Sequence, residues 1–154
     1  KGLLIDGKDF PGVVKSFVTV DNILETLTSN NIPVEFDFLS IDIDGNDYWI
    51  LKKILSQFKP RVIVSEFNSE HPIEESKTIK YNPDFKFDNY SDYYGYTYGA
   101  GLKLAAEFGY TIIYQQSNMN LFYLRNDLVT ETPSFPVQMF RHWNQHSELE
   151  WVWV

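Results

Sequence analysis

Residues 38–51 read FLSIDIDGNDYWIL, and this stretch decides the fold class of the chain. An apolar run from Phe38 to Ile41 leads into the aspartates Asp42, Asp44 and Asp47 and then into apolar residues at helical spacing. Repulsion between close carboxylates and loss of solvation both oppose three acids at the end of a buried strand. The acids must therefore cap and turn the chain, or hold a ligand. A buried strand followed at once by a helix is the repeating unit of an α/β fold.

The sequence after this stretch continues the alternation of helices and strands. A helix is expected from Asn46 or Asp47 to about Phe58, with its inward face made of Tyr48, Ile50, Leu51, Ile54 and Leu55. Residues 62–64 form a buried strand closing in Ser65–Asn68, and residues 69–97 form a long aromatic loop. A helix over 99–108 ends at Gly109, and strands over 110–114 and 120–124 predict an antiparallel hairpin.

The sequence before the stretch predicts two more strands and one more helix. Residues 2–6 and 16–20 have the composition of strands, and Asp21 is a suitable N-cap for a helix over 22–31. The continuous apolar run of residues 36–41 predicts a strand buried on both faces. We therefore predict one α/β domain over residues 1–154, Rossmann-like, with a mainly parallel sheet, a C-terminal antiparallel hairpin and an extension over 126–154.

The charge and composition of the chain exclude several classes of partner. The 154 residues carry a formal net charge of -8, and no cluster of Lys or Arg interrupts this acidity, which argues against nucleic-acid binding. The chain has no cysteine, which excludes disulfides and thiolate zinc sites. No apolar run reaches the roughly 20 residues of a membrane span. We expect a soluble, cytoplasmic protein without a membrane or nucleic-acid partner.

Acidic and amide side chains follow several of the predicted strands. Ligands of open α/β sheets bind beyond the carboxyl ends of the strands, where the chain places Asp6, Asp42, Asp44, Glu66 and Asn68. Carboxylate and amide oxygens are ligands for Mg²⁺ or Ca²⁺. A cation site is therefore one prediction, with the ligands Asp42, Asp44, Glu66 and Asn68. In the alternative, Asp44 or Asp47 caps the helix and Glu66 accepts backbone hydrogen bonds.

Three further groups of residues are candidates for a functional role, and each also has a purely structural interpretation. His71 follows Glu66 closely and is either a base near the strand end or part of a surface loop. Tyr94 and Tyr96 belong to a tyrosine-rich segment that either stacks on an acceptor or packs as a lid on the sheet. Trp151 and Trp153 either form an edge strand or are buried in a partner.

Three segments resemble FkbM-type and related class I S-adenosylmethionine-dependent methyltransferases: DFLSIDIDGNDYWILKKIL at 37–55, KPRVIVSEFN at 59–68 and YGAGLKLAAEFGYTIIYQQSNMNLFYLRNDL at 98–128. LLIDGK at 3–8 is similar to that family's second strand, whose acidic end faces the cofactor ribose. The resemblance implies S-adenosylmethionine as cofactor, held by Asp6 and Asp42, and O-methyl transfer to a small-molecule or sugar hydroxyl. It also implies catalytic roles for Asp42, Glu66 and His71 and, by likeness to metal-dependent O-methyltransferases, a cation that orients and acidifies the acceptor hydroxyl.

The chain departs from that family in one respect. The family's first strand and its glycine-rich loop would precede Lys1, and no G-x-G-x-x-G motif occurs in the chain. We therefore expect weak or absent cofactor binding by this chain alone. Because the missing strand is central in that fold, residues 2–6 would pair with residues 38–42, a neighbour would supply a strand, or part of the sheet would be lost. A homodimer is the expected repair.

Two other functions remain open at this point. A degenerate domain of the same fold could bind or assemble without catalysing a reaction. The stretch DIDGND at 42–47 also resembles the haloacid-dehalogenase loop, in which the first aspartate attacks a phosphate and the second serves as the acid. Asn46 stands where that loop has threonine, and no later acidic pair with a suitable lysine accompanies it.

Overall fold

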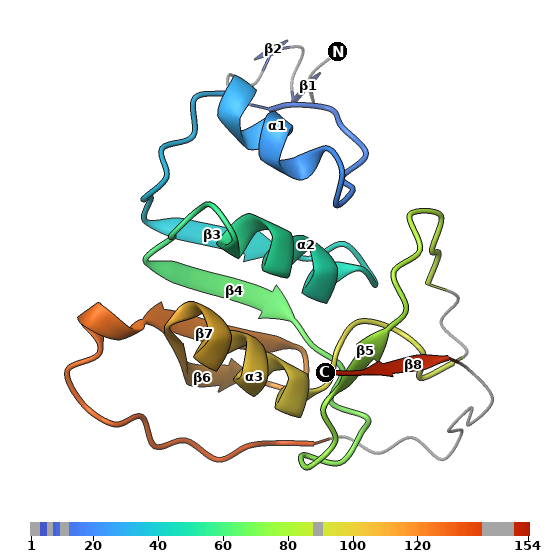
Figure 1. Ribbon diagram of the computed structural model, residues 1–154, viewed down its shortest axis with the longest axis vertical. Helices are drawn as coiled ribbons and strands as arrows, with labels where there is room; N and C mark the ends of the chain where they lie inside the picture. The colour runs from blue at the N-terminus through green and yellow to red at the C-terminus, as the bar shows by residue number, and fades with distance from the viewer. Residues whose placement is uncertain (1–3, 6–7, 10–12, 88–90, 140–149) are drawn as a thin grey trace.

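The computed structural model describes residues 4–5, 8–9, 13–87, 91–139 and 150–154, and its centre is a mixed four-stranded sheet in the order β3-β4-β7-β6 (Figure 1). Strand β3 (Phe38–Ile41) pairs in parallel with β4 (Val62–Glu66). Strand β7 (Asn120–Arg125) lies between β4 and β6 (Tyr110–Gln116) and runs antiparallel to both. The α/β class and the terminal hairpin are confirmed.

The expected mainly parallel sheet is not confirmed, because one of these three pairings is parallel and two are antiparallel. The short connection between β6 and β7 is the cause, since a tight turn can join only antiparallel neighbours. The second arm of the hairpin also inserts between β4 and the first arm. As a result β6 points in the same direction as β3 and β4, and only β7 is reversed.

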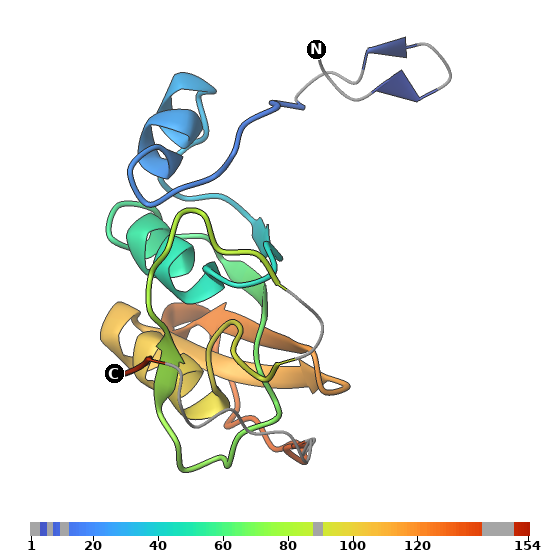
Figure 2. The same cartoon turned by 90° about the vertical axis from the view of Figure 1, so that its right-hand side faces the viewer.

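Helices α2 (Asp47–Leu55) and α3 (Tyr98–Phe108) cover the same face of the sheet (Figures 1 and 2). All five predicted inward residues of α2 are buried. Thr97 is the N-cap of α3, and its hydroxyl accepts the Ala100 N–H. Gly109 is the C-cap, in the left-handed conformation, so the helix ends there as predicted. The core lies between these helices and the alternate residues of β4 and β7, among them Ile63, Leu121 and Tyr123.

The strand predicted at residues 36–41 is shorter and more open than expected. It spans Phe38–Ile41, Phe38 is 56% exposed, and of its four residues only Ile41 is buried. Among the described residues β3 has a single neighbour, β4, so it is an edge strand. A continuous run of apolar residues is buried on both faces of a strand only where other elements cover both faces of the sheet.

The N-terminal part of the chain differs most from the prediction. Among the described residues, strands β1 (Leu4–Ile5) and β2 (Lys8–Asp9) pair only with each other, and β1 does not pair with β3. Residues 16–20 form no strand, and Phe17 is 72% exposed. Helix α1 (Ile23–Ser29) has Asn22 at its N-cap rather than Asp21. A strand-like composition produces a strand only where a neighbour supplies the ladder, and residues 16–20 have none.

The long aromatic loop carries a short strand of its own. Strand β5 (Lys77–Ile79) pairs antiparallel with β8 (Trp151–Trp153), so the two tryptophans do form an edge strand within the chain. The C-terminal extension begins with a short 3-10 helix, η1 (Asn126–Leu128). Further along, the Gln115 side-chain amide donates to the Gln138 carbonyl and accepts the Gln138 N–H. In the part of the chain that the structure describes, no helix is long and apolar enough to span a bilayer.

Candidate functional site

The loop between β3 and α2 is held in place by the buried carboxylate of Asp47. Its two oxygens accept the N–H of Ile43 at 3.0 Å and of Gly45 at 2.9 Å. Asp44 adopts a φ of 56°, a left-handed conformation that aspartate tolerates better than most residues. Asp47 is the first residue of α2, and Asn46 is the N-cap without a side-chain cap bond. Asp47 therefore braces the preceding loop and does not cap the helix.

The segment after β5 lies against the same loop. A Cβ added at Gly45 would meet the Phe85 ring at 2.3 Å, so glycine is required where the ring approaches the backbone. The Asn46 amide donates to the Asn82 carbonyl at 2.7 Å. One turn into α2, the Trp49 indole N–H donates to the Ile79 carbonyl at 2.8 Å. These contacts hold the loop between β3 and α2 against residues 79–85.

Three of the four predicted cation ligands come together at the carboxyl ends of β3 and β4. One carboxylate oxygen from each of Asp42, Asp44 and Glu66 lies within 4.8 Å of the others. Asp42 and Asp44 are exposed, whereas Glu66 is half-buried. Burial raises the pKa of Glu66 to about 7, with further contributions from the negative charges of Asp47, Asp42 and Asp44. Burial likewise raises the pKa of Asp47.

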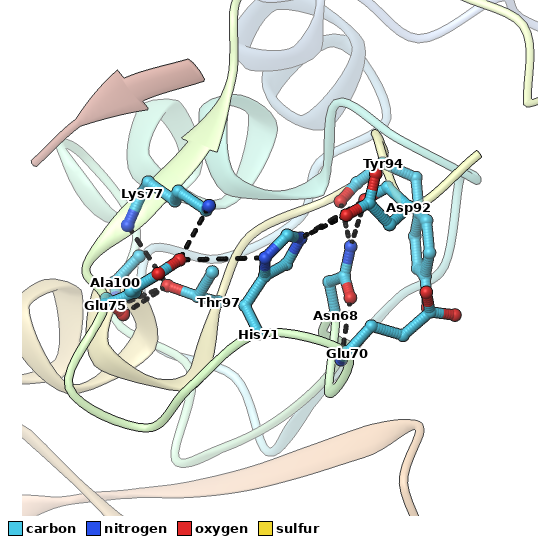
Figure 3. Close-up of polar contacts among 9 residues, drawn as sticks. All are labelled: Asn68, Glu70, His71, Glu75, Lys77, Asp92, Tyr94, Thr97 and Ala100. Atoms are coloured by element: carbon cyan, nitrogen blue, oxygen red, sulfur yellow. Dashed lines mark hydrogen bonds and ion pairs between the residues drawn. The ribbon is translucent and has the colours of Figure 1, made fainter. Parts of the chain in front are cut away.

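Asn68, the fourth predicted ligand, is fully buried and uses its amide for the protein's own structure (Figure 3). Its NH₂ donates to the carbonyls of Asp92 at 2.7 Å and Tyr94 at 3.0 Å, and its oxygen accepts the Glu70 N–H. Its backbone N–H donates to the Tyr96 carbonyl at 2.7 Å. Asn68 thus ties the end of β4 to the segment that carries Tyr94, and it does not join the acidic cluster.

The two tyrosines predicted to contact an acceptor differ in their surroundings. Tyr96 is fully buried, and its hydroxyl lies 2.8 Å from the Tyr123 hydroxyl in the core, so it has no surface for an acceptor. Tyr94 is half-buried and forms an edge-on ring pair with Phe87 at 5.0 Å. Burial raises the pKa of Tyr94, helped by the nearby charges of Glu70 and Glu66. Of the two tyrosines, Tyr94 is therefore the one that is only partly buried.

His71 is buried rather than placed on a surface loop, and its ring lies between Glu75 and Asp92 (Figure 3). Its Nδ1 lies 3.6 Å from a Glu75 oxygen and its Nε2 lies 3.6 Å from an Asp92 oxygen. The Trp151 ring packs edge-on against the imidazole at 4.7 Å between centroids. Burial lowers the pKa of His71, and the charge of Lys77 lowers it further. With 2% of its surface exposed, His71 is not open to a substrate.

The structure does not describe one predicted site residue, and it shows two contacts that the sequence did not predict. Asp6, the predicted ribose ligand, lies outside the described residues. The bracing role of Asp47 and the contact of Phe85 with Gly45 were not predicted. The DG pair at residues 44–45 signals a turn that needs a brace, but nothing in the local sequence identifies Phe85 as its neighbour.

The comparisons with known proteins assign a family to most of this region. The model of the Methyltransferase FkbM domain matches residues 7–98, which is more than half of the chain and includes β3, α2, β4 and β5. Asp42, Asp44 and Glu66 fall within the matched range, whereas Asp6 precedes it. No curated protein and no solved structure gave a match.

Proposed function

We propose that this chain, which belongs to the FkbM methyltransferase domain family, takes part in O-methyl transfer from S-adenosylmethionine to a small-molecule or sugar hydroxyl. Family membership supports methyl transfer in general. The cofactor, the acceptor class and the residue roles are our proposal, and they rest on the geometry at the ends of β3 and β4. The same membership favours this function over a haloacid-dehalogenase-like phosphatase built on residues 42–47.

The observation that carries the proposal is the state of Glu66. A general base works best when its pKa lies near the working pH, and burial among acids gives Glu66 a pKa of about 7. Glu66 is half-buried, so the residue is not closed off from solvent. In the proposed reaction Glu66 would accept the proton of the acceptor hydroxyl while the hydroxyl oxygen bonds to the methyl carbon and the methyl–sulfur bond breaks, which leaves the cofactor as a neutral thioether.

The described residues fit the charge of the proposed cofactor. S-Adenosylmethionine, when bound, supplies an electrophilic methyl group on a positively charged sulfur. Asp42 and Asp44 are exposed carboxylates beside Glu66, so this acidic cluster attracts a cation, and its oxygens can accept hydrogen bonds from hydroxyl or amino groups. We assign cofactor contact to Asp42. Asp6 remains a proposal outside the described residues.

Tyr94 supports an acceptor with a flat apolar face. Its ring and that of Phe87, which is 36% exposed, form an aromatic pair, and the charges of Glu70 and Glu66 act on the Tyr94 hydroxyl. Sugar rings and aromatic rings both bind on such surfaces. The surrounding negative charge disfavours acceptors that carry phosphate or carboxylate groups. We therefore propose a neutral hydroxyl compound as acceptor.

A divalent cation held by Asp42, Asp44 and Glu66 is the second possibility for the same acidic cluster. The spacing of their oxygens permits it, and the oxygen ligands suit Mg²⁺ or Ca²⁺. Such an ion would orient the acceptor hydroxyl and lower its pKa. Asn68 would not be a ligand, because its amide is committed to Asp92, Tyr94 and Glu70.

A thermal-shift titration with S-adenosylmethionine tests the proposed function. We expect the melting temperature to rise with cofactor in the millimolar range, because a ligand stabilises the state that it binds. Asp42→Ala should remove this shift, whereas Asp84→Ala, an exposed acid of the loop after β5, should retain it. A parallel arm with Mg²⁺ or Ca²⁺ alone tests the cation site with the same two variants.

The absence of any cofactor-dependent shift in the wild-type chain would contradict cofactor binding by this chain. It would favour the alternative of a non-catalytic binding or assembly domain. A cation-dependent shift that Asp42→Ala removes would support the cation site independently of the cofactor result.

We also propose that two copies of the chain associate through β3. Among the described residues, one side of β3 has no neighbouring strand, and unpaired strand edges invite pairing with another chain. Phe38 and Val34, at 56% and 55% exposed, add apolar surface next to this edge. Two β3 strands related by a two-fold axis would pair antiparallel.

Sedimentation equilibrium tests this association. We expect a monomer–dimer equilibrium in the wild type and a dissociation constant raised by about tenfold or more in Phe38→Lys, because a charge on the edge opposes pairing. The control is Phe17→Lys, which alters an apolar residue that is 72% exposed and lies outside the strand. A wild-type chain that stays monomeric at high concentration would refute the dimer.

A further inference from the structure

Strand β8 is held by one short strand and by side-chain contacts, among them those of Trp151 with Tyr93 and of Val154 with the core. Within the described residues it pairs with β5 alone, in the register Lys77 to Trp153 and Ile79 to Trp151 (Figure 1). The Val154 N–H donates to the Ser76 carbonyl, and Lys103 donates to the Val154 carbonyl. Short strands with a single neighbour open at a lower free energy than the core of a domain. Strand β8 belongs to a two-stranded sheet apart from the main sheet, so its pairing with β5 is expected to open at a lower free energy than the pairing within the main sheet.

Strand β8 covers three titratable side chains, of which His71 is fully buried, Lys77 is largely buried and Glu75 is partly exposed. The Trp151 ring lies over His71, and the Lys77 Nζ lies 4.6 Å from the centre of the Trp151 ring and 5.6 Å from that of Trp153. Lys77 also forms an ion pair with Glu75 at 2.6 Å. If β8 left β5, its tryptophans would leave with it, and His71 would become accessible to water.

The cover leaves His71 poorly placed to carry a positive charge. Both carboxylates that face it, Glu75 and Asp92, lie 3.6 Å from its ring nitrogens, beyond hydrogen-bond length. Nδ1 has no hydrogen-bond partner, and the Nε2 contact with the Asp92 carbonyl is long, at 3.4 Å. The oxygen of Glu75 nearest to Nδ1 is already paired with Lys77, whose charge also opposes protonation of the ring.

Among the described residues, the other charged groups near β8 are Lys103, which donates to the Val154 carbonyl, and the pair formed by Glu150 and Lys80. Glu150 forms an ion pair with Lys80 at 2.7 Å, and its backbone carbonyl accepts the Tyr93 hydroxyl at 2.8 Å. Lys80 and Glu150 are both largely exposed, so their attraction is weak and screened by salt. The group that titrates between pH 5 and 8 beneath the strand is therefore His71.

We propose that β8 is an acid-releasable strap, which closes over the neutral imidazole of His71 and separates from β5 when that imidazole takes up a proton. The proposal does not depend on the proposed methyl transfer. Release of β8 would also break the contact of His71 with the Asp92 carbonyl. Asp92 lies two residues before Tyr94, and its carbonyl also accepts a hydrogen bond from Asn68. Acid release would thus loosen the segment that carries Tyr94.

The direction of the pH dependence follows from linkage. The pKa of His71 is lowered in the closed form by burial and by Lys77, whereas in the open form it returns to its ordinary value near 6.5. The open form therefore binds more protons. Closure is complete above the ordinary pKa and is lost progressively as the pH falls below it, by about tenfold in the closing equilibrium between pH 7.5 and 5.5.

Amide hydrogen exchange tests the strap, with rates corrected for their intrinsic pH dependence. We expect the protection of residues 151–154 to fall by about tenfold from pH 7.5 to 5.5, while the amides of β7 keep theirs. His71→Gln should abolish the fall, since glutamine does not titrate. The matched control replaces the other two histidines, His142→Gln and His146→Gln together, and should retain it.

An NMR titration of the wild-type His71 ring provides a second measurement that needs no variant. Its midpoint should coincide with the midpoint for loss of β8 protection. The proposal is overturned if β8 and β7 lose protection together, if the fall persists in His71→Gln, or if the two midpoints differ. Equal protection of β8 at both pH values would also overturn it.

Discussion

Replacing Gly99 by alanine should lower the free energy of unfolding by about 2–3 kcal/mol, the usual cost of forcing an extra methyl group into a packed site. Gly99 lies in the first turn of α3, and a Cβ there would be 2.4 Å from the Glu75 carbonyl oxygen and 3.3 Å from that of Ile73. Both neighbours are backbone atoms, so relief requires the segment to move. The higher helix propensity of alanine offsets only about 1 kcal/mol.

Chemical denaturation of three proteins measures this effect. Gly109→Ala is the matched comparison: Gly109 has a φ of 78° and no atom within 4 Å of an added Cβ, so only the left-handed backbone is penalised, by about 1 kcal/mol. The melting temperature of Gly99→Ala should fall by about 5–10 °C. A Gly99→Ala protein as stable as the wild type would show that residues 73–75 do not pack against α3.

Replacing Glu66 by glutamine should make the protein more stable at pH 8 and leave it nearly unchanged at pH 4. The pKa of Glu66 is raised from 4.5 to about 7, so the fold favours the protonated carboxyl. That stabilisation is fully present below the unfolded pKa and is lost as the pH rises through about 7. Glutamine carries no charge at either pH and therefore escapes the loss.

The expected size at pH 8 is about 1–2 kcal/mol. The full pKa shift would give an upper bound of roughly 3 kcal/mol, and solvent access to the half-buried carboxyl reduces it. Denaturation of wild type and Glu66→Gln at pH 4, 6 and 8, without divalent cations, yields the difference directly. Glu74→Gln, an exposed acid of the following loop, is the control and should show no such trend.

A pH-independent difference between wild type and Glu66→Gln would contradict the raised pKa. It would also remove the argument for Glu66 as a general base near neutral pH. The comparison is made as a difference because His71 contributes the opposite trend: its pKa is lowered, so its contribution to stability grows with pH. That contribution is common to both proteins and cancels.

Local sequence determined those elements whose signals lie within a few residues of one another. Helix α2 follows from the spacing of its inward residues, α3 ends where Gly109 permits the left-handed turn, and the β6–β7 hairpin joins two apolar runs. The order of acids along the chain also predicted that Asp42, Asp44 and Glu66 meet, because strands β3 and β4 are parallel neighbours and end at the same edge.

Tertiary structure alone decided which of the candidate residues remain available. Asn68, His71 and Tyr96 read as site residues in the sequence, yet each is buried by partners 20 or more residues away, such as Asp92, Trp151 and Tyr123. The same holds for β3, whose apolar sequence predicted burial but whose neighbour lies on one side only. Burial and pairing depend on contacts distant in the chain, whereas helical spacing and turn chemistry are local, and only the local terms can be read from the sequence.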